Sequence, residues 1–352
     1  RMNTYSADVL FRHERTERLR GTVGASGFIQ TNATRGEEPL VPGARVAALG
    51  VFGFEEISLA PRWTASVGVR GDVRRLEAEE NAELEVEEQT RNYSALTGNI
   101  GILYRPARAV GLAANVARGW RAPNFFELFA NGEHKGTARF EIGDPTIGPE
   151  TSVNVDLALR WEHPVARGEL SVFRSAIRDF IFIEPTGDID PESGLRVFRY
   201  RSSNALLWGV EAHAEVHPIH ELVLRGTFDW VRGEETRTDE PLPLIPPARL
   251  GLAAEWHQDV GAPWAERAYV SLATEVVTRQ KRVSEFDVPT APYTLHHAAA
   301  GIAFRVGRRT LSADLQVRNL TDKAYRAFLS RYKEFALDQG RNVILRLTTG
   351  LY

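Results

Sequence analysis

The sequence predicts an all-β protein, a transmembrane up-and-down antiparallel β-barrel. Apolar and polar residues alternate with a period of two in about fifteen segments of roughly 10 to 18 residues, whereas the helical spacing of apolar residues is hard to find. Short and long connections also alternate along the chain. Strands of this length have a physical reason in a membrane, where they cross an apolar layer about 25 Å thick at a tilt.

The alternation recurs throughout the chain. In residues 153–161 every odd position carries a large apolar side chain, and the even positions are polar or small. Because neighbouring side chains of a strand point to opposite faces, such a segment has one apolar and one polar face. The same pattern occupies residues 63–70, 96–104, 222–230, 250–256 and 311–318.

The connections between these segments differ in length in a regular way. Short connections are expected near residues 14–18, 60–62, 106–109, 163–167, 218–220, 259–267 and 306–309. Long polar connections are expected near residues 31–43, 77–91, 122–150, 184–197, 234–247, 281–292 and 320–340. Short periplasmic turns and long extracellular loops are typical of an outer-membrane barrel. A soluble sandwich has strands of about 5 to 6 residues and no reason for this alternation.

Aromatic residues lie near the ends of the predicted strands, where a barrel carries its two interfacial girdles. The residues concerned are Trp63, Tyr104, Trp120, Trp161, Trp208, Trp230, Trp256, Tyr293 and Tyr352. Together with the strand length, they favour a membrane barrel.

Chain length indicates that the barrel continues beyond this sequence. Fifteen strands in 352 residues use about 23 residues each, and a 22-stranded, plugged barrel at that rate needs about 520 residues. Single-chain bacterial barrels usually have an even number of strands, and an open sheet edge in lipid is prohibitive. We therefore expect residues 1–352 to be the C-terminal part of a 22-stranded barrel, with the first strands and a plug domain absent from this chain.

Composition excludes several other classes of protein. The chain has no Cys, so it has no disulfide framework and no Cys-ligated metal site. Its net charge of −3 argues against binding to nucleic acid, which requires a basic excess. We find no Gly-rich phosphate loop, no Ser/His/Asp order and no His-Glu-x-x-His helix, and predict that the chain is not an enzyme and requires no cofactor.

Four short motifs resemble those of the TonB-dependent outer-membrane receptors. Residues 119–129 are similar to the segment GxRAPxxxEL, and residues 143–152 to G(N/D)PxLxPExS; residues 317–325 are similar to xxNLxDxxY and residues 340–342 to GRx. The motif residues are Arg121, Pro123, Glu127, Asp144, Pro145, Pro149, Glu150, Asn319, Leu320, Asp322, Tyr325, Gly340 and Arg341. The order of the motifs along the predicted strands is that of the family.

Three further segments resemble the zinc-uptake branch of this family. Residues 130–143 are similar to AxGxHxxTxxFExG, residues 242–251 to LPxIPPxRLG and residues 179–182 to xDFIY. Residues 326–333 differ, since they contain no His where many members of that branch carry one in the last extracellular loop.

The resemblance implies a receptor of the Gram-negative outer membrane that imports a scarce metal ion or a metal chelate, zinc or of the siderophore type. It also implies three partners: the TonB complex of the inner membrane, acting through the plug, the outer-membrane lipid, and the small metal or chelate ligand. The alternatives are a passive porin-like channel, a receptor for cobalamin or a sugar, and, from another class, a soluble all-β carbohydrate-binding or scaffold protein.

The longest predicted loop contains the candidate ligand-binding residues. Glu133, His134, Glu141 and Asp144 offer one imidazole and three carboxylates, a set that suits Zn²⁺, and His134 and Glu141 are the candidate metal ligands. Phe125, Phe126 and Phe129 of the same loop are expected either to shape an apolar vestibule for a chelate or to cap the barrel rim.

Overall fold

The computed structural model describes residues 1–34, 39–285, 287–306 and 309–349. Among these residues are 17 strands of one sheet and one short α-helix. The long strands are β1 (Met2–Thr16), β2 (Leu19–Asn32), β3 (Ala44–Ala60), β4 (Trp63–Ala78), β5 (Gln89–Ala107), β6 (Val110–Arg121), β9 (Glu150–His163), β10 (Ala166–Ile189), β11 (Arg196–Ile219), β12 (Leu222–Glu235), β13 (Arg249–Ala262), β14 (Ala265–Val277), β15 (Tyr293–Val306), β16 (Arg309–Arg318) and β17 (Asn342–Thr349). The connection between β6 and β9 contains α1 (Phe125–Phe129), β7 (Asn131–His134) and β8 (Arg139–Ile142).

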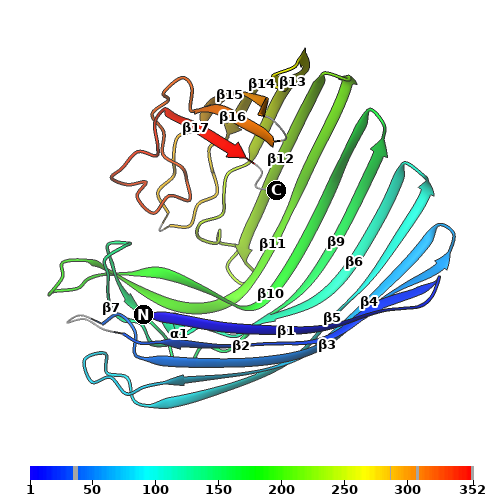
Figure 1. Ribbon diagram of the computed structural model, residues 1–352. Coiled ribbons are helices and arrows are strands. Elements are labelled where there is room, and N and C mark those ends of the chain that lie inside the picture. Colours follow the sequence, from blue (N-terminus) through cyan, green and yellow to red (C-terminus); the bar gives the residue numbers. More distant parts are fainter. Residues whose placement is uncertain (35–38, 286, 307–308, 350–352) are drawn as a thin grey trace.

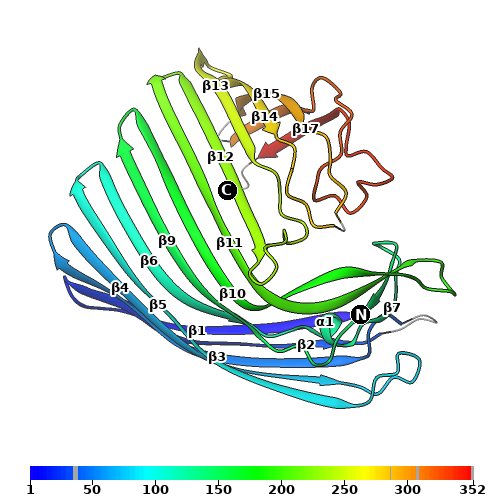
Figure 2. The ribbon, with the colours of Figure 1, turned by 180° about the vertical axis from the view of Figure 1, so that it is seen from behind.

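The long strands pair antiparallel with their neighbours in chain order, with β6 next to β9. The sheet curves like a section of a barrel wall (Figures 1 and 2). The tight turns gather at one end of the strands and the long connections at the other (Figure 1). The predicted antiparallel, up-and-down architecture is confirmed, and the end with the long connections is the extracellular end of such a barrel.

The two faces of the sheet differ as the alternation predicts. The odd residues of β9 from Val153 to Leu157 are exposed apolar side chains. On the same face, Val155 and Leu157 pair with Val116 and Ala114 of β6, and Val153 pairs with Arg118. Aromatic side chains pack in pairs on this apolar face near the strand ends: the rings of Trp63 and Tyr104 stack with centroids 4.2 Å apart. This face is therefore the lipid-facing one.

The opposite face carries charged side chains that pair across strands. Arg225 of β12 binds Glu215 of β11 at 2.8 Å and Glu255 of β13 at 3.1 Å. Tyr269 of β14 donates a hydrogen bond to Asp314 of β16 at 2.9 Å. Because charges are tolerated where they face water or protein rather than lipid, this is the face of the barrel lumen.

Two local features differ from the sequence-based expectations. We expected no helix, yet α1 forms one turn and a half after Arg121. We expected a loop over residues 184–197, but β10 and β11 continue to Ile189 and from Arg196. A register shift between Pro185 and Ile189 accommodates the proline, which has no backbone donor for the ladder.

A buried apolar cluster lies at the extracellular end. It joins the ends of β3 and β4 to α1 and to β10, and its members are Val41, Ala44, Val46, Leu76, Ala78, Phe125, Leu128, Phe129, Ala130, Ile147 and Ile181. Within the described ranges, no helix is long and apolar enough to cross a membrane.

Candidate functional site

The connection between β6 and β9 is the most structured of the long loops. Its start is set by a capping box at α1: the side chain of Asn124 accepts hydrogen bonds from the backbone N–H groups of Phe126 (2.8 Å) and Glu127 (3.0 Å). The carboxylate of Glu127 in turn accepts the backbone N–H of Asn124 at 2.8 Å. These reciprocal bonds satisfy donors that a short helix otherwise leaves free.

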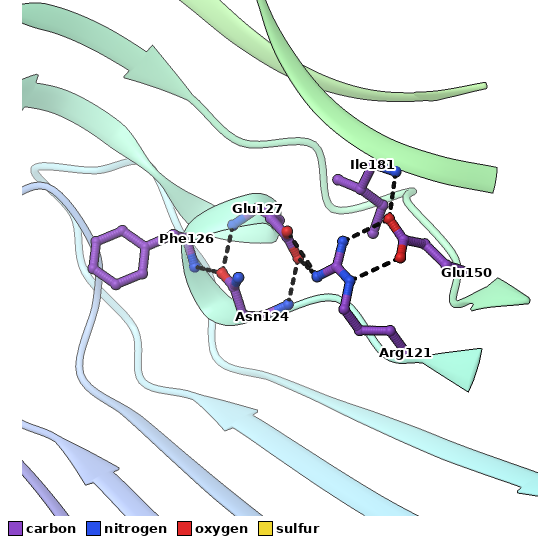
Figure 3. Close-up of polar contacts among 6 residues, drawn as sticks. All are labelled: Arg121, Asn124, Phe126, Glu127, Glu150 and Ile181. Atoms are coloured by element: carbon purple, nitrogen blue, oxygen red, sulfur yellow. Dashed lines mark hydrogen bonds and ion pairs between the residues drawn. The ribbon is translucent and has the colours of Figure 1, made fainter. Parts of the chain in front are cut away.

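Arg121 connects this helix to the barrel wall (Figure 3). Its Nη1 binds both carboxylate oxygens of Glu127 at 2.8 and 2.9 Å, while Nε and Nη2 bind Glu150 at 2.9 and 2.7 Å. Glu150 also accepts the backbone N–H of Ile181 in β10 at 2.6 Å. Three motif residues predicted separately from the sequence thus form one hydrogen-bonded clamp between the end of β6, the helix and the start of β9.

The aromatic residues of the loop pack inward. Phe125 and Phe129 are buried in the apolar cluster, together with Val46 and Leu76 of the strands below, and Phe126 packs against the cluster from its edge. The structure therefore places these rings at the barrel rim, under the loop. Their shared role in this position is to anchor α1 to the lumen-facing side of β3 and β4.

The return of the loop passes very close to the helix. A Cβ atom on Gly143 would lie 2.6 Å from the backbone of Leu128 and Phe129, so glycine is required there for steric reasons. Asp144 follows, and its carboxylate accepts the N–H of Thr146 at 2.8 Å and the hydroxyl at 2.6 Å. Asp144 thus shapes a turn and does not approach the histidine of the same loop.

His134 and Glu141 lie opposite each other in the small β7–β8 hairpin. Nδ1 of His134 is 2.9 Å from Oε1 of Glu141, a carboxylate that is only 3% exposed. Glu141 also accepts hydrogen bonds from Thr137 (3.3 Å) and Tyr200 (3.3 Å). Nε2 of His134 has no hydrogen-bond partner in the described part of the chain, and is the atom that an external ligand could reach.

The four candidate ligands of the loop are not all brought together. Glu133 projects from β7 next to Phe140 in the hairpin register, and Asp144 is engaged in its own turn. Across the described residues, no group of three or more His, Asp or Glu side chains is arranged to hold an ion. A metal ion at His134 would thus need further ligands from solvent, from a chelator or from loop movement.

Beside this pair lies a group of arginines around one aromatic ring. The guanidinium of Arg139 lies 4.1 Å from the ring centre of Phe198, and that of Arg196 lies 5.7 Å from it. Burial lowers the pKa of Arg139, and the positive charge of Arg331 lowers it further. This cationic and aromatic surface differs from the carboxylate set that we expected to dominate the loop.

Hydrogen bonds join the extracellular loops to one another. The hydroxyl of Tyr332, in the β16–β17 loop, donates to the carbonyl of Gly136 at 3.0 Å. Lys333 is buried and binds Asp287 of the β14–β15 loop at 3.3 Å; Asp287 also accepts the N–H of Leu244 from the β12–β13 loop at 2.7 Å. No sequence pattern pointed to this lysine, because a single charge in a polar loop is usually solvated.

The second pair of motifs forms a compact structure at the base of the last extracellular loop. The side chain of Asn319 donates to the carbonyl of Lys323 at 2.9 Å and accepts its N–H at 2.8 Å. Asp322 accepts the N–H of Arg341 at 2.8 Å, and Nε of Arg341 donates to the carbonyl of Leu320 at 3.0 Å. A Cβ on Gly340 would lie 2.9 Å from Asp322, and the ring of Tyr325 packs on Tyr293.

The remaining motif prolines hold loop positions. Pro123 is almost fully buried beside the helix. The carbonyl of Pro145 accepts a hydrogen bond from Arg91 of β5 at 3.0 Å, and Pro149 directly precedes the strand that carries Glu150. The motif residues therefore serve the two loop bases rather than one common pocket.

Known proteins resemble this chain over most of its length. The family described as TonB dependent receptor-like, beta-barrel matches residues 4–320. Heme/hemopexin utilization protein C of Haemophilus influenzae (strain 86-028NP) is 26% identical over 231 residues, 60% of this chain and 32% of that protein. The vitamin B12 transporter BtuB of Vibrio vulnificus (strain YJ016) is 25% identical over 246 residues, 70% of this chain and 36% of that protein.

Solved structures share the fold. The copper transporter OprC aligns with a TM-score of 0.81 at 18% identity, covering 99% of this chain and 56% of that one. BauA, the ferric preacinetobactin receptor from Acinetobacter baumannii, aligns with a TM-score of 0.71 at 18% identity, covering 99% and 54%. The chain thus spans about a third of the length of the two relatives above and about half of these structures.

Proposed function

Because the chain belongs to the TonB-dependent receptor β-barrel family of the outer membrane, we propose that it is part of a receptor that imports a scarce metal ion or a metal chelate. The related proteins are receptors and transporters, not enzymes. In this proposal residues 1–352 supply the C-terminal part of the barrel.

The observation that carries the metal proposal is the pair formed by His134 and Glu141. A buried carboxylate that binds Nδ1 of a histidine fixes the ring and favours the tautomer in which Nε2 can bind a metal. The hairpin lies in an extracellular loop, where a ligand first meets the protein. The likeness of residues 130–143 to the zinc-uptake branch supports Zn²⁺ as the ion.

A second candidate substrate is an anionic metal chelate of the siderophore type. Arg139 and Arg196 lie over the ring of Phe198, next to the same hairpin, and the positive charge of Arg331 acts on Arg139. Guanidinium groups bind carboxylate and phenolate oxygens well, and an aromatic ring offers a flat apolar contact. The absence of His in residues 326–333 also favours this candidate over the bare ion.

The test is calorimetric titration of the protein in detergent with Zn²⁺ and, separately, with ferric chelates. The variants are His134→Ala and Glu141→Ala, and the matched control is His220→Ala with Glu221→Ala, at the periplasmic turn after β11. We expect saturable Zn²⁺ binding that weakens by about tenfold or more in each loop variant, since each removes a ligand or its orienting partner. The control variant should bind Zn²⁺ as the unaltered protein does.

Other results would assign the function differently. Binding of a chelate but not of Zn²⁺ would retain the receptor and make the hairpin a shape-determining element. If neither binds and the protein conducts ions freely in a planar bilayer, the porin-like alternative holds and the import proposal fails.

A further inference from the structure

His134 shares one face of a small three-stranded sheet with two arginines. In this sheet β7 pairs antiparallel with β8, and β8 pairs in parallel with the start of β11. His134 stands directly opposite Arg139 in this register, and Glu141 stands beside Phe198. Because alternate residues of a strand lie on the same face, Arg196 of β11 also lies on this face. Its guanidinium, like that of Arg139, lies over the ring of Phe198.

Arg139 is a half-buried cation without an acidic partner. Its guanidinium lies 4.1 Å from the ring centre of Phe198, and it makes no ion pair or side-chain hydrogen bond with the residues that the structure describes. The carboxylates of Glu141 and Glu334 act on it from a distance, but burial and the positive charge of Arg331 outweigh them and lower its pKa. Burying an unpaired charge is costly, so an anion bound beside Arg139 would be stabilised there.

His134 offers a single metal ligand at the same place. Its Nδ1 lies 2.9 Å from Glu141, a buried carboxylate that also accepts hydrogen bonds from Thr137 and Tyr200. This arrangement leaves Nε2 for an external partner. Within the described ranges, no set of three or more His, Asp or Glu side chains is placed to hold an ion. Zn²⁺ takes about four ligands in proteins, so the others must come from outside these residues.

From these contacts we propose that His134 binds a metal ion carried by an anionic chelator that leaves one coordination position open. Carboxylate or phenolate groups of the chelator bind to Arg139, Arg196 and Arg331, and Nε2 of His134 takes the open position on the metal. The substrate class is therefore an incomplete, negatively charged metal complex. This inference rests on the proposed function and narrows its substrate.

The charges of the site favour such a complex over a bare ion. In the hairpin register the Cβ atoms of His134 and Arg139 lie about 5 Å apart, so a bare Zn²⁺ on Nε2 would lie close to a guanidinium group. Like charges at such distances repel each other. Even with the negative charges of Glu141 and Glu334, a bare Zn²⁺ beside three arginines leaves a net positive site.

The imidazole favours an incomplete complex over a saturated one. A chelate that encloses its metal fully still offers anionic groups to the arginines, but it has no position for Nε2 of His134. The contact between Nδ1 and the buried carboxylate of Glu141 would then orient the imidazole toward no ligand. An anionic complex with one open position uses both the arginines and the imidazole.

The test compares three probes by calorimetric titration of the protein in detergent: Zn²⁺ alone, its complex with nitrilotriacetate and its complex with ethylenediaminetetraacetate (EDTA). Nitrilotriacetate is tetradentate and leaves zinc open to an imidazole, whereas EDTA is hexadentate and closes it. We expect the nitrilotriacetate complex to bind about tenfold more tightly than either other probe. It alone gains both the metal–imidazole bond and charge-assisted hydrogen bonds from the arginines.

Variants separate the two kinds of contact. His134→Ala should remove the preference for the nitrilotriacetate complex over the EDTA complex. It should also abolish the change that binding causes in the visible spectrum of cobalt nitrilotriacetate. Arg139→Gln should weaken binding of zinc nitrilotriacetate about tenfold without weakening that of Zn²⁺ alone. The matched control is Arg199→Gln, which removes an exposed arginine from the opposite face of β11 and should leave all affinities unchanged.

The outcomes distinguish this inference from the proposed function. Binding of Zn²⁺ alone as tight as that of its nitrilotriacetate complex, or equal affinities of the two complexes, would overturn the inference and leave metal import standing. Failure of all three probes to bind would contradict both. Far-UV circular dichroism checks that each variant is folded. If Arg139→Gln does not fold, Arg331→Gln removes a charge from a different loop and should weaken binding of zinc nitrilotriacetate alone.

Discussion

Arg121 combines two roles that the sequence motifs suggested separately. One planar guanidinium serves two carboxylates, Glu127 from the helix and Glu150 from the strand, and both are largely buried. Only arginine provides paired donors along two edges for such a contact, so a lysine would lose half of the hydrogen bonds. The residue therefore determines where the loop leaves and rejoins the barrel.

We predict that Arg121→Ala loosens α1 while leaving the barrel folded. The change leaves the carboxylates of Glu127 and Glu150 without a cation and with little solvent around them. Because Arg121 itself is 41% exposed, we expect the local structure to lose about 2 kcal/mol of stability, less than for a fully buried pair. Amide hydrogen exchange of residues 124–130 should accelerate by about 30-fold. Arg160→Ala, which removes a more exposed partner of Glu169, should leave that exchange unchanged, and equal acceleration in both variants would refute the clamp.

The candidate site was predictable at some residues and not at others. Arg121, Glu127 and Glu150 were identified from their motifs, and Glu141 and His134 from their spacing in one loop. Tyr200 and Lys333 escaped prediction because their partners, Glu141 and Asp287, lie 59 and 46 residues away. Asn124 was the missed local signal, since an Asn followed by Glu three residues later predicts a helix start.

The β6–β9 connection is stabilised by close packing of its returning chain against α1 as well as by strand pairing. Gly143 lets the returning chain touch the end of α1, and its N–H donates to the carbonyl of Ala130 at 2.6 Å. The β7–β8 hairpin is then positioned against β11 by parallel pairing at Val197 to Arg199. Helix, hairpin and strand are therefore joined by direct contacts.

Gly143→Ala should therefore disturb the whole connection. The added methyl overlaps backbone atoms of Leu128 and Phe129, which cannot rotate away, and the expected cost is about 1 to 3 kcal/mol. Limited proteolysis should cut the loop faster than in the unaltered protein. Gly148→Ala is the control, because nothing lies within 4 Å of its added Cβ, and a similar cleavage rate in the two variants would contradict the packing described.

At the scale of the whole molecule, the barrel places lipid on one face and lumen on the other. Leu157 and Ala158 are neighbours in β9 with opposite orientations, and Leu157 is 50% exposed on the apolar face. The assignment of the two faces rests on this alternation, which continues from β1 to β17.

An arginine should be tolerated on one face and not on the other. We expect Leu157→Arg to lower the free energy of unfolding in phospholipid vesicles by about 2 to 4 kcal/mol, because a charge near the bilayer centre is poorly solvated. Ala158, one residue away, faces the lumen, so Ala158→Arg should lower the free energy of unfolding far less. Urea titration followed by tryptophan fluorescence measures the free energy of unfolding of both variants. A larger loss for Ala158→Arg than for Leu157→Arg would contradict the assignment of the two faces.

Local patterns in the sequence predicted the strands, their short turns and the two faces of the sheet. The period of two and the alternation of loop lengths are local properties of the sequence. They predict a barrel because, in lipid, only a closed or continuing sheet satisfies the hydrogen bonds of the backbone N–H and C=O groups. The loop assignment failed between β10 and β11 because cross-strand pairing beyond the membrane extends strands that local polarity would end.

Which loop residues meet depends on long-range packing, and no local pattern predicted it. In the folded chain His134 and Glu141 lie together, whereas Glu133 and Asp144 lie apart from them. Phe125 and Phe129 are buried at the barrel rim. Contacts between segments far apart in the chain depend on register and loop packing, and no short pattern in the sequence encodes these.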